Sequence, residues 1–303
     1  MRSSRFAPVV FCIGLGLVLA ACSPAAQSPS PTLVPRLGST QGTPGVLTGA
    51  LPATDLAVGP NQRFLLALIG PDNRLVTEAA VDLAFFKVTG PNEAQLRSRA
   101  PAEYREAPGL PGRGIYVARA EFDEAGEWGV AALVRQPSGE QTELRHSFQV
   151  KDRSATPSIG TMVPLSRTLT ASTAAEVERF CSSRPGDAFH RLSVADALAQ
   201  RKPFAVLFAT PGFCESRTCG PSLDVLQALS QQYGDQMNFV HVEIYKDGRP
   251  NDKRETVPAV GEWSLTSEPW LFVVGADGRL VDKFEGSITM EEAGPVLKAL
   301  LGA

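Results

Sequence analysis

The stretch KPFAVLFATPGFCESRTCGPSLDVLQAL, residues 202–229, decides how the carboxyl-terminal half of this chain is interpreted. Its continuous apolar run, Phe204–Ala209, is typical of a strand that is buried on both faces of a sheet. Over residues 221–233 the leucines recur at helical spacing, and Pro221 suits the first turn of a helix. The sequence therefore predicts a buried strand, then a loop that carries Cys214 and Cys219, then a helix.

The loop between this strand and this helix holds the residues with the clearest chemistry. A cysteine attacks only as a thiolate, and the amino terminus of a helix lowers the thiol pKa because its free N–H groups stabilise negative charge. A second cysteine nearby can attack the mixed disulfide and release the partner. Cys214 and Cys219 are therefore the candidate catalytic residues. Glu215 would raise the cysteine pKa and Arg217 would lower it.

Elements of alternating type surround this segment. Ser193 is followed three residues later by Asp196, which indicates a capped helix start before the buried strand. Strands are predicted over residues 238–245, 270–275 and 279–284, and Thr289 is predicted to cap a final helix. The order α-β-α-β, a long connection, then β-β-α predicts an α/β fold.

Residues 192–301 resemble the thioredoxin superfamily, in particular its membrane-anchored branch of the TlpA and ResA types. Phe213-Cys214 stands where that family has Trp-Cys, and SEPWLFVVGADGRLVDKFEG (residues 267–286) is similar to its cis-proline strand and hairpin. The resemblance implies a thioredoxin-like fold, with a cis Glu268–Pro269 bond beside the cysteine pair. It also implies thiol–disulfide oxidoreductase activity toward exported protein thiols and disulfides.

The cysteine spacing departs from that family, because four residues separate Cys214 from Cys219 where two are usual. In one register Cys219 aligns with the second family cysteine, and Cys214 attacks; the helix spacing favours this register. In the other register Cys219 attacks, and Ser222 replaces the second cysteine. In either case we expect a reversible Cys214–Cys219 disulfide, because exported thiols tend to pair and a short loop closes at little entropic cost.

The other cysteine and histidine residues suggest no metal site and no cofactor. Cys181 is a small buried residue, a free thiol or a third partner for exchange, and these alternatives stay open. His190 is predicted at the surface and His241 within a strand. The wide cysteine spacing also resembles the Sco-type copper chaperones, which add a distal histidine. Copper delivery is a minor alternative, because His241 is the only histidine after the cysteines and follows Cys219 by only 22 residues.

The amino-terminal residues predict export and lipid anchoring. Arg2 and Arg5 precede a short apolar run, so residues 1–21 have the order of a secretory signal peptide. Leu19-Ala20-Ala21-Cys22 resembles a bacterial lipobox, which implies that Cys22 is lipidated. Residues 22–45 are rich in Pro, Ser and Thr and are interpreted as a flexible tether. We therefore expect an extracytoplasmic protein that is lipid-anchored to the bacterial cell membrane.

Residues 46–150 alternate with period two between turn signals such as Gly70-Pro71-Asp72-Asn73, which predicts six or seven strands of an immunoglobulin-like antiparallel β-sandwich. Its single histidine, His146, offers no metal site, so a docking or spacer module is expected. Residues 151–175 are interpreted as a linker and residues 176–303 as the thioredoxin-like domain. A net charge of −3 without a basic run excludes nucleic acid as a partner. A non-catalytic docking lipoprotein whose cysteines form a structural bridge remains the main alternative to the oxidoreductase.

Overall fold

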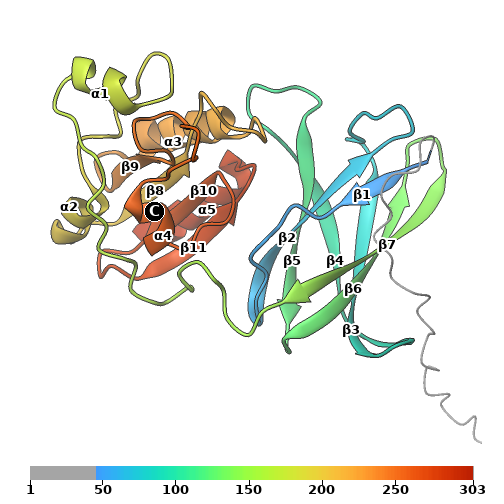
Figure 1. Cartoon of the computed structure of the whole chain (residues 1–303). Helices are drawn as coiled ribbons and strands as arrows, with labels where there is room; N and C mark the ends of the chain where they lie inside the picture. The colour runs from blue at the N-terminus through green and yellow to red at the C-terminus, as the bar shows by residue number, and fades with distance from the viewer. Residues whose placement is uncertain (1–45, 303) are drawn as a thin grey trace, which may run out of the picture. The chain divides into compact units, whose positions relative to one another are not determined.

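The computed structural model describes residues 46–302. The predicted signal peptide, tether and lipidated Cys22 lie outside these residues. The described chain has two parts, an antiparallel β-sandwich of seven strands and a mixed α/β region (Figure 1). None of the described helices is long and apolar enough to cross a membrane.

The seven strands of the sandwich are all antiparallel to their neighbours, in the order β1-β2-β5-β4-β3-β6-β7. They are β1 (Thr48–Ala50), β2 (Gly59–Ile69), β3 (Ala80–Gly90), β4 (Glu93–Glu106), β5 (Gly114–Phe122), β6 (Gly126–Arg135) and β7 (Gln141–Val150). Nine of the first ten residues of β4 pair with β3, and its last four pair with β5. One strand therefore continues from one sheet of the sandwich into the other. The prediction of an antiparallel β-sandwich with six or seven strands is therefore confirmed.

Alternating apolar residues of these strands form the core of the sandwich. Phe64, Phe85, Phe122 and Trp128 are at most 1% exposed. The rings of Phe64 and Phe85 meet edge to face at 5.0 Å, and those of Phe122 and Trp128 do so at 5.0 Å. Edge-to-face contacts of this kind stabilise a core beyond the area that they bury.

Nine elements make up the α/β region. They are α1 (Ala174–Phe180), α2 (Val194–Ala199), β8 (Phe204–Ala209), α3 (Cys219–Tyr233), β9 (Asn238–Glu243), α4 (Pro258–Glu262), β10 (Trp270–Val274), β11 (Leu280–Glu285) and α5 (Met290–Leu301). The sheet order is β11-β10-β8-β9, with β8 parallel to β9 and the other pairs antiparallel. The sheet is therefore mixed, and β8 occupies an inner position.

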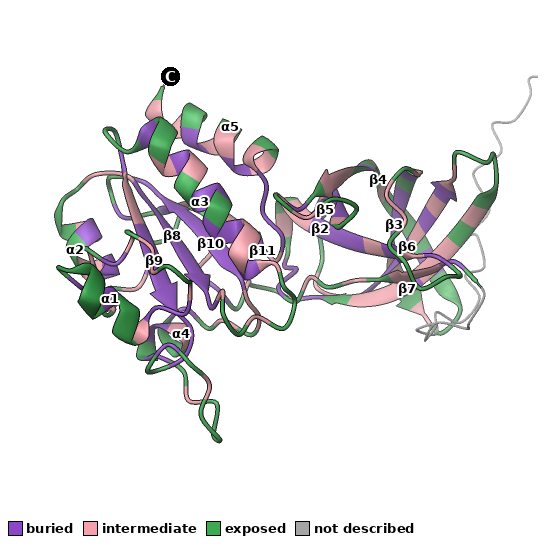
Figure 2. Cartoon of the chain, turned by 90° about the horizontal axis from the view of Figure 1, so that it is seen from above, coloured by how far each residue is buried: buried purple, intermediate pink, exposed green. Residues whose placement is uncertain are grey.

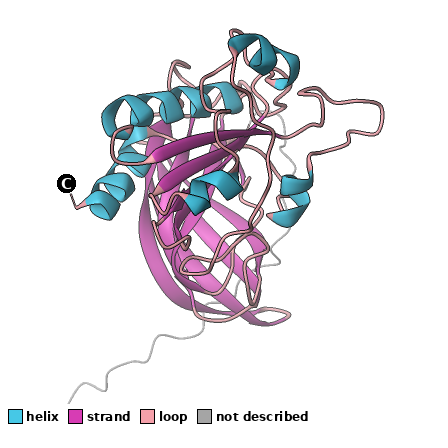
Figure 3. Ribbon diagram, turned by 90° about the vertical axis from the view of Figure 1, so that its left-hand side faces the viewer, coloured by secondary structure: helices cyan, strands magenta, loops and turns pink. Residues whose placement is uncertain are grey.

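Strand β8 is buried on both faces, as its apolar run predicts (Figure 2). Phe204, Val206 and Phe208 belong to one hydrophobic core. Residues 205, 207 and 209 alternate with them and pack in a second core with α3 and α5. Because successive side chains of a strand point to opposite faces, one continuous apolar run serves both cores. Figure 3 shows helices flanking the strands of this region.

Two short helices, α1 and α4, and the strands β1 and β4 were not predicted from the sequence. The helices have seven and five residues, which is too short for a helical repeat of apolar positions to be visible. β4 is mostly exposed or half-buried and has no apolar alternation. Its backbone pairing with both β3 and β5 defines it instead.

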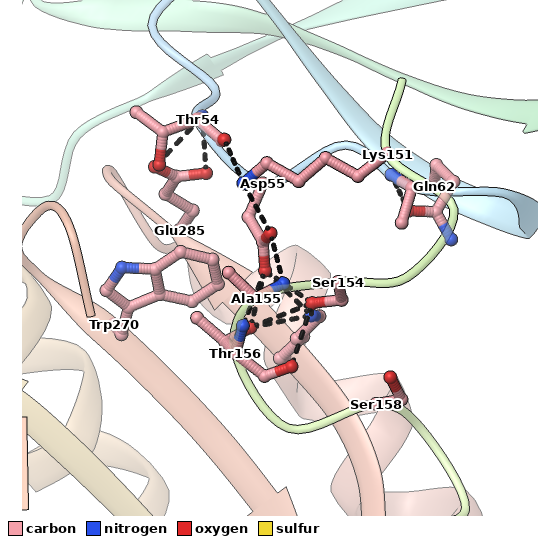
Figure 4. Close-up of polar contacts among 12 residues, drawn as sticks. Thr54, Asp55, Gln62, Lys151, Ser154, Ala155, Thr156, Ser158, Trp270 and Glu285 are labelled. Atoms are coloured by element: carbon pink, nitrogen blue, oxygen red, sulfur yellow. Dashed lines mark hydrogen bonds and ion pairs between the residues drawn. The ribbon is translucent and has the colours of Figure 1, made fainter. Parts of the chain in front are cut away.

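Buried polar contacts order residues 154–156, within the segment predicted as a linker (Figure 4). The carboxylate of Asp55 accepts the N–H groups of Ala155 at 2.7 Å and Thr156 at 3.0 Å. Lys283 of β11 approaches the same carboxylate at 3.3 Å. Burial raises the pKa of Asp55, but the hydrogen bonds and the Lys283 charge outweigh it and hold this pKa well below its usual range.

Candidate functional site

Cys214 and Cys219 form a disulfide whose Cα atoms are 6.0 Å apart. Cys219 is the first residue of α3 and is completely buried, whereas Cys214 lies in the preceding loop and is partly exposed. The helix was predicted from about residue 221 and begins two residues earlier. The Cys214 sulfur is therefore accessible to a second molecule, whereas the Cys219 sulfur lies in the protein interior.

The amino terminus of α3 is directed at the Cys214 sulfur. The N–H of Cys219 donates to the Cys214 Sγ at 3.3 Å. A free N–H at a helix start stabilises negative charge, so this contact favours a thiolate on Cys214 once the bridge is reduced. The Ser216 hydroxyl lies 3.3 Å from the same sulfur. Cys214 therefore precedes the helix and Cys219 opens it, an arrangement that both registers share.

The loop between the cysteines turns sharply at Arg217, which has a φ of 60°. Its N–H donates to the carbonyl of Cys214 at 3.3 Å. Glu215 does not pair with Arg217 but with Arg254 at 2.9 Å, and both side chains of that ion pair are more than half exposed. Phe213, next to the exposed cysteine, is 45% exposed and offers an apolar surface.

Glu268 lies beside the cysteine pair, with a carboxylate oxygen within 4.8 Å of both sulfur atoms. The Glu268–Pro269 peptide bond is cis. Burial, and then repulsion from the Glu243 carboxylate, raise the pKa of Glu268 to about 7. Among residues 46–302, its Oε2 has no hydrogen-bond partner. The group therefore changes charge near neutral pH beside the disulfide.

A cavity of about 330 Å³ opens next to this loop. The loop contributes Ser216, Arg217 and Thr218 to its wall, and Glu268 also lines it. Apolar side chains face the same space: Leu65, Leu75, Leu110 and Ile115. An apolar side chain of a bound peptide would fit there.

A second cluster lies apart from the disulfide and joins residues far apart in the sequence. The Asp187 Oδ2 is 3.2 Å from the Cys181 Sγ, 3.2 Å from the His190 Nε2 and 2.8 Å from the His241 Nδ1. The prediction of a surface position for His190 was wrong, because that side chain is 1% exposed. Its neighbours Phe180 and His241 cover the ring. His241 lies in β9, as predicted, and Cys181 is a buried free thiol.

The cluster strongly shifts the proton affinities of its members. Burial alone raises the pKa of the Cys181 thiol, but hydrogen bonds with His190 and His241 outweigh it and lower this pKa to about 7. The same two histidines hold the pKa of Asp187 well below its usual range in spite of burial. Burial lowers the pKa of both histidines, but hydrogen bonds with Asp187 outweigh it and raise them. No sequence motif signalled this cluster, because its residues come from a helix end, a loop and a strand.

Comparisons with known proteins give only distant structural similarity. No protein-family model matches the chain, and no curated protein matches it. CopC from Methylosinus trichosporium OB3b is 17% identical, with 34% of this chain and 93% of that chain covered at a TM-score of 0.21. The copper resistance protein PcoC from Escherichia coli is 18% identical over 33% and 93% of the two chains, with a TM-score of 0.19. The soluble domain of PmoD from Methylocystis sp. is 11% identical over 34% and 90%, with a TM-score of 0.19.

Proposed function

We propose that this protein is an extracytoplasmic, lipid-anchored thiol–disulfide oxidoreductase with a thioredoxin-like domain, and that it acts through Cys214 and Cys219. One observation carries the proposal: a partly exposed sulfur accepts the first N–H of α3 and is bridged to a buried sulfur. The mixed sheet with its inner strand β8 directly before the cysteine loop supports it. The Leu19-Ala20-Ala21-Cys22 motif supports export and the lipid anchor.

The reduced pair would act in two exchange steps. The Cys214 thiolate attacks one sulfur of a partner disulfide, the partner S–S bond breaks, and its other sulfur leaves as a thiolate that takes up a proton. The Cys219 sulfur, after losing its proton, then attacks Cys214, which breaks the mixed disulfide and releases the second partner thiol. Two electrons pass from the pair to the partner, and the reverse sequence oxidises a partner dithiol.

In this proposal Glu268 exchanges the proton of the second step. Its carboxylate lies within 4.8 Å of the Cys219 sulfur, and its pKa of about 7 lets it accept or return a proton near neutral pH. Cys219 is completely buried and does not contact bulk water directly, so a neighbouring group such as Glu268 is needed to exchange its proton. Exported protein thiols and disulfides are the proposed partners, with Phe213 and the neighbouring cavity as the surfaces that they contact.

The reduction potential of the Cys214–Cys219 couple tests the proposal. We expect a reduction potential above about −300 mV, because structural disulfides usually have potentials below this value and catalytic disulfides have higher ones. Equilibration of the full chain with glutathione buffers, followed by thiol labelling, measures it. A bridge that stays oxidised in every such buffer would assign the pair to a structural role and leave the docking alternative.

Glu268→Gln is expected to weaken the pH dependence of stability. The folded pKa of about 7 is raised above the ordinary value of 4.5, so the folded protein holds this proton more tightly than the unfolded chain. The contribution is therefore fully present below about pH 4.5 and is lost as the pH rises through about 7. Glutamine cannot ionise, so relative to the wild type the variant gains stability as the pH rises from about 4.5 to about 7.

Urea denaturation at a series of pH values checks this prediction. Glu103→Gln is the matched control, because it removes the same charge from a side chain that is 63% exposed and lies in β4 of the sandwich. An identical pH slope for Glu268→Gln and the wild type would contradict the raised pKa of Glu268.

A further inference from the structure

We propose that Cys181, Asp187, His190 and His241 form a binding site for a zinc ion, separate from the disulfide and from its exchange chemistry. The four side chains each offer one ligand atom, and these atoms all lie within 4.8 Å of one another. They supply one sulfur, two nitrogens and one oxygen, which is a donor set that zinc accepts in tetrahedral sites.

The distances between the donor atoms suit a small tetrahedral ion. Zinc bonds of about 2.0–2.3 Å place the corners of a tetrahedron about 3.3–3.8 Å apart. In the cluster, three donors converge on the Asp187 Oδ2 at 2.8 to 3.2 Å. An ion would replace these contacts once the Asp187 oxygen moved away from the other three donors.

Neighbouring hydrogen bonds already orient two of the ligands. The Nε2 of His241 is 3.2 Å from the carbonyl oxygen of Ala209, which leaves its Nδ1 to face the cluster. A histidine that binds a metal usually donates its other ring N–H in this way. The N–H of Phe189 donates to the Asp187 Oδ1 at 2.9 Å, and this turns the Oδ2 toward the other donors.

His190 provides a second, independent observation that points to a ligand at this cluster. Its ring is 1% exposed, yet within the described part of the chain its Nδ1 has no hydrogen-bond partner. A buried polar atom without a partner is destabilising, so such atoms are rare in native proteins. A metal bound by the Nδ1 of this ring would remove that cost.

Charge and access also fit a divalent cation. A thiolate on Cys181 and the carboxylate of Asp187 carry two negative charges, which one Zn²⁺ neutralises while both histidines stay neutral. Calcium and magnesium prefer oxygen ligands, and the carboxylate makes the set harder than Cu(I) prefers. A cavity of about 380 Å³ is lined by both histidines and provides a path for the ion.

Zinc titration of a full chain that carries Cys214→Ser and Cys219→Ser tests the site. We expect one equivalent of Zn²⁺ to bind in competition with a chromophoric chelator, with release of protons from the ligands. Co²⁺ in its place should show tetrahedral ligand-field bands and a thiolate charge-transfer band. Because Cys214 and Cys219 are absent from this variant, a failure to bind zinc would not contradict the proposed oxidoreductase activity.

Ligand variants in the same background identify the site. Cys181→Ser should remove the thiolate band and weaken zinc binding at least about 100-fold. Loss of a residue that only orients a metal ligand weakens binding by up to about 100-fold, and loss of a ligand itself should cost at least as much. Asp187→Asn should weaken binding while keeping the band, which provides a second readout if Cys181→Ser fails to fold. Asp224→Asn is the surface control and should change neither. Absence of stoichiometric Zn²⁺ and Co²⁺ binding, or retention of the band in Cys181→Ser, would overturn the proposal, as would a clear preference for Cu(I) over zinc.

Discussion

Cys214→Ser is expected to abolish exchange with partner disulfides, with a fall in rate of about 10³-fold or more, on the scale seen when a nucleophile is removed. The physical reason is the position of the two sulfurs. Cys214 is partly exposed and its sulfur accepts the first N–H of α3, whereas Cys219 is completely buried. Only Cys214 can meet a partner without a rearrangement of the helix start. The rate of the reduced variant with a model disulfide measures this.

Cys219→Ser is the matched variant, and it should behave in the opposite way. It retains the attacking thiol and lacks the resolving thiol, so a mixed disulfide between Cys214 and the partner should accumulate. Mass spectrometry of the product measures the trapped fraction. If Cys214→Ser keeps the first step and Cys219→Ser loses it, the other register holds and Cys219 is the attacker. If neither variant traps a partner, the pair is a structural bridge.

Trp128→Ala is expected to lower the free energy of unfolding of the sandwich by about 3–5 kcal/mol. The side chain is 0% exposed, its ring meets that of Phe122 at 5.0 Å, and its Nε1–H donates to the carbonyl of Glu124 at 2.9 Å. Removal of the ring leaves a cavity that the close-packed aromatic core cannot fill, and it leaves that carbonyl without its donor. Chemical denaturation followed by circular dichroism measures the change.

Leu96→Ala is the matched control, because this apolar side chain of β4 is 46% exposed and its loss should change stability by no more than about 0.5 kcal/mol. An equal loss in both variants would contradict the prediction. So would a Trp128→Ala protein that unfolds at the same denaturant concentration as the wild type.

The sequence by itself determined the features that rest on local pattern. The apolar run Phe204–Ala209 required a strand buried on both faces, and the leucines that follow required a helix with one apolar side. Ser193 and Asp196 identified a capped helix start. Alternation with period two determined an antiparallel sandwich before Val150. Each of these patterns depends only on residues that are close together in the sequence, so it can be recognised before the tertiary structure is known.

Only the tertiary structure decided which distant side chains meet. Glu268 has a raised pKa because the fold buries it near Glu243, 25 residues away in the sequence. His190 is buried because Phe180 and His241 cover it, and only one of these two residues lies near it in the sequence. The cluster of Cys181, Asp187, His190 and His241 forms because the end of α1 and the following loop lie against β9. Burial and charge pairing between distant segments depend on the packing of the whole chain, and no local pattern in the sequence encodes them.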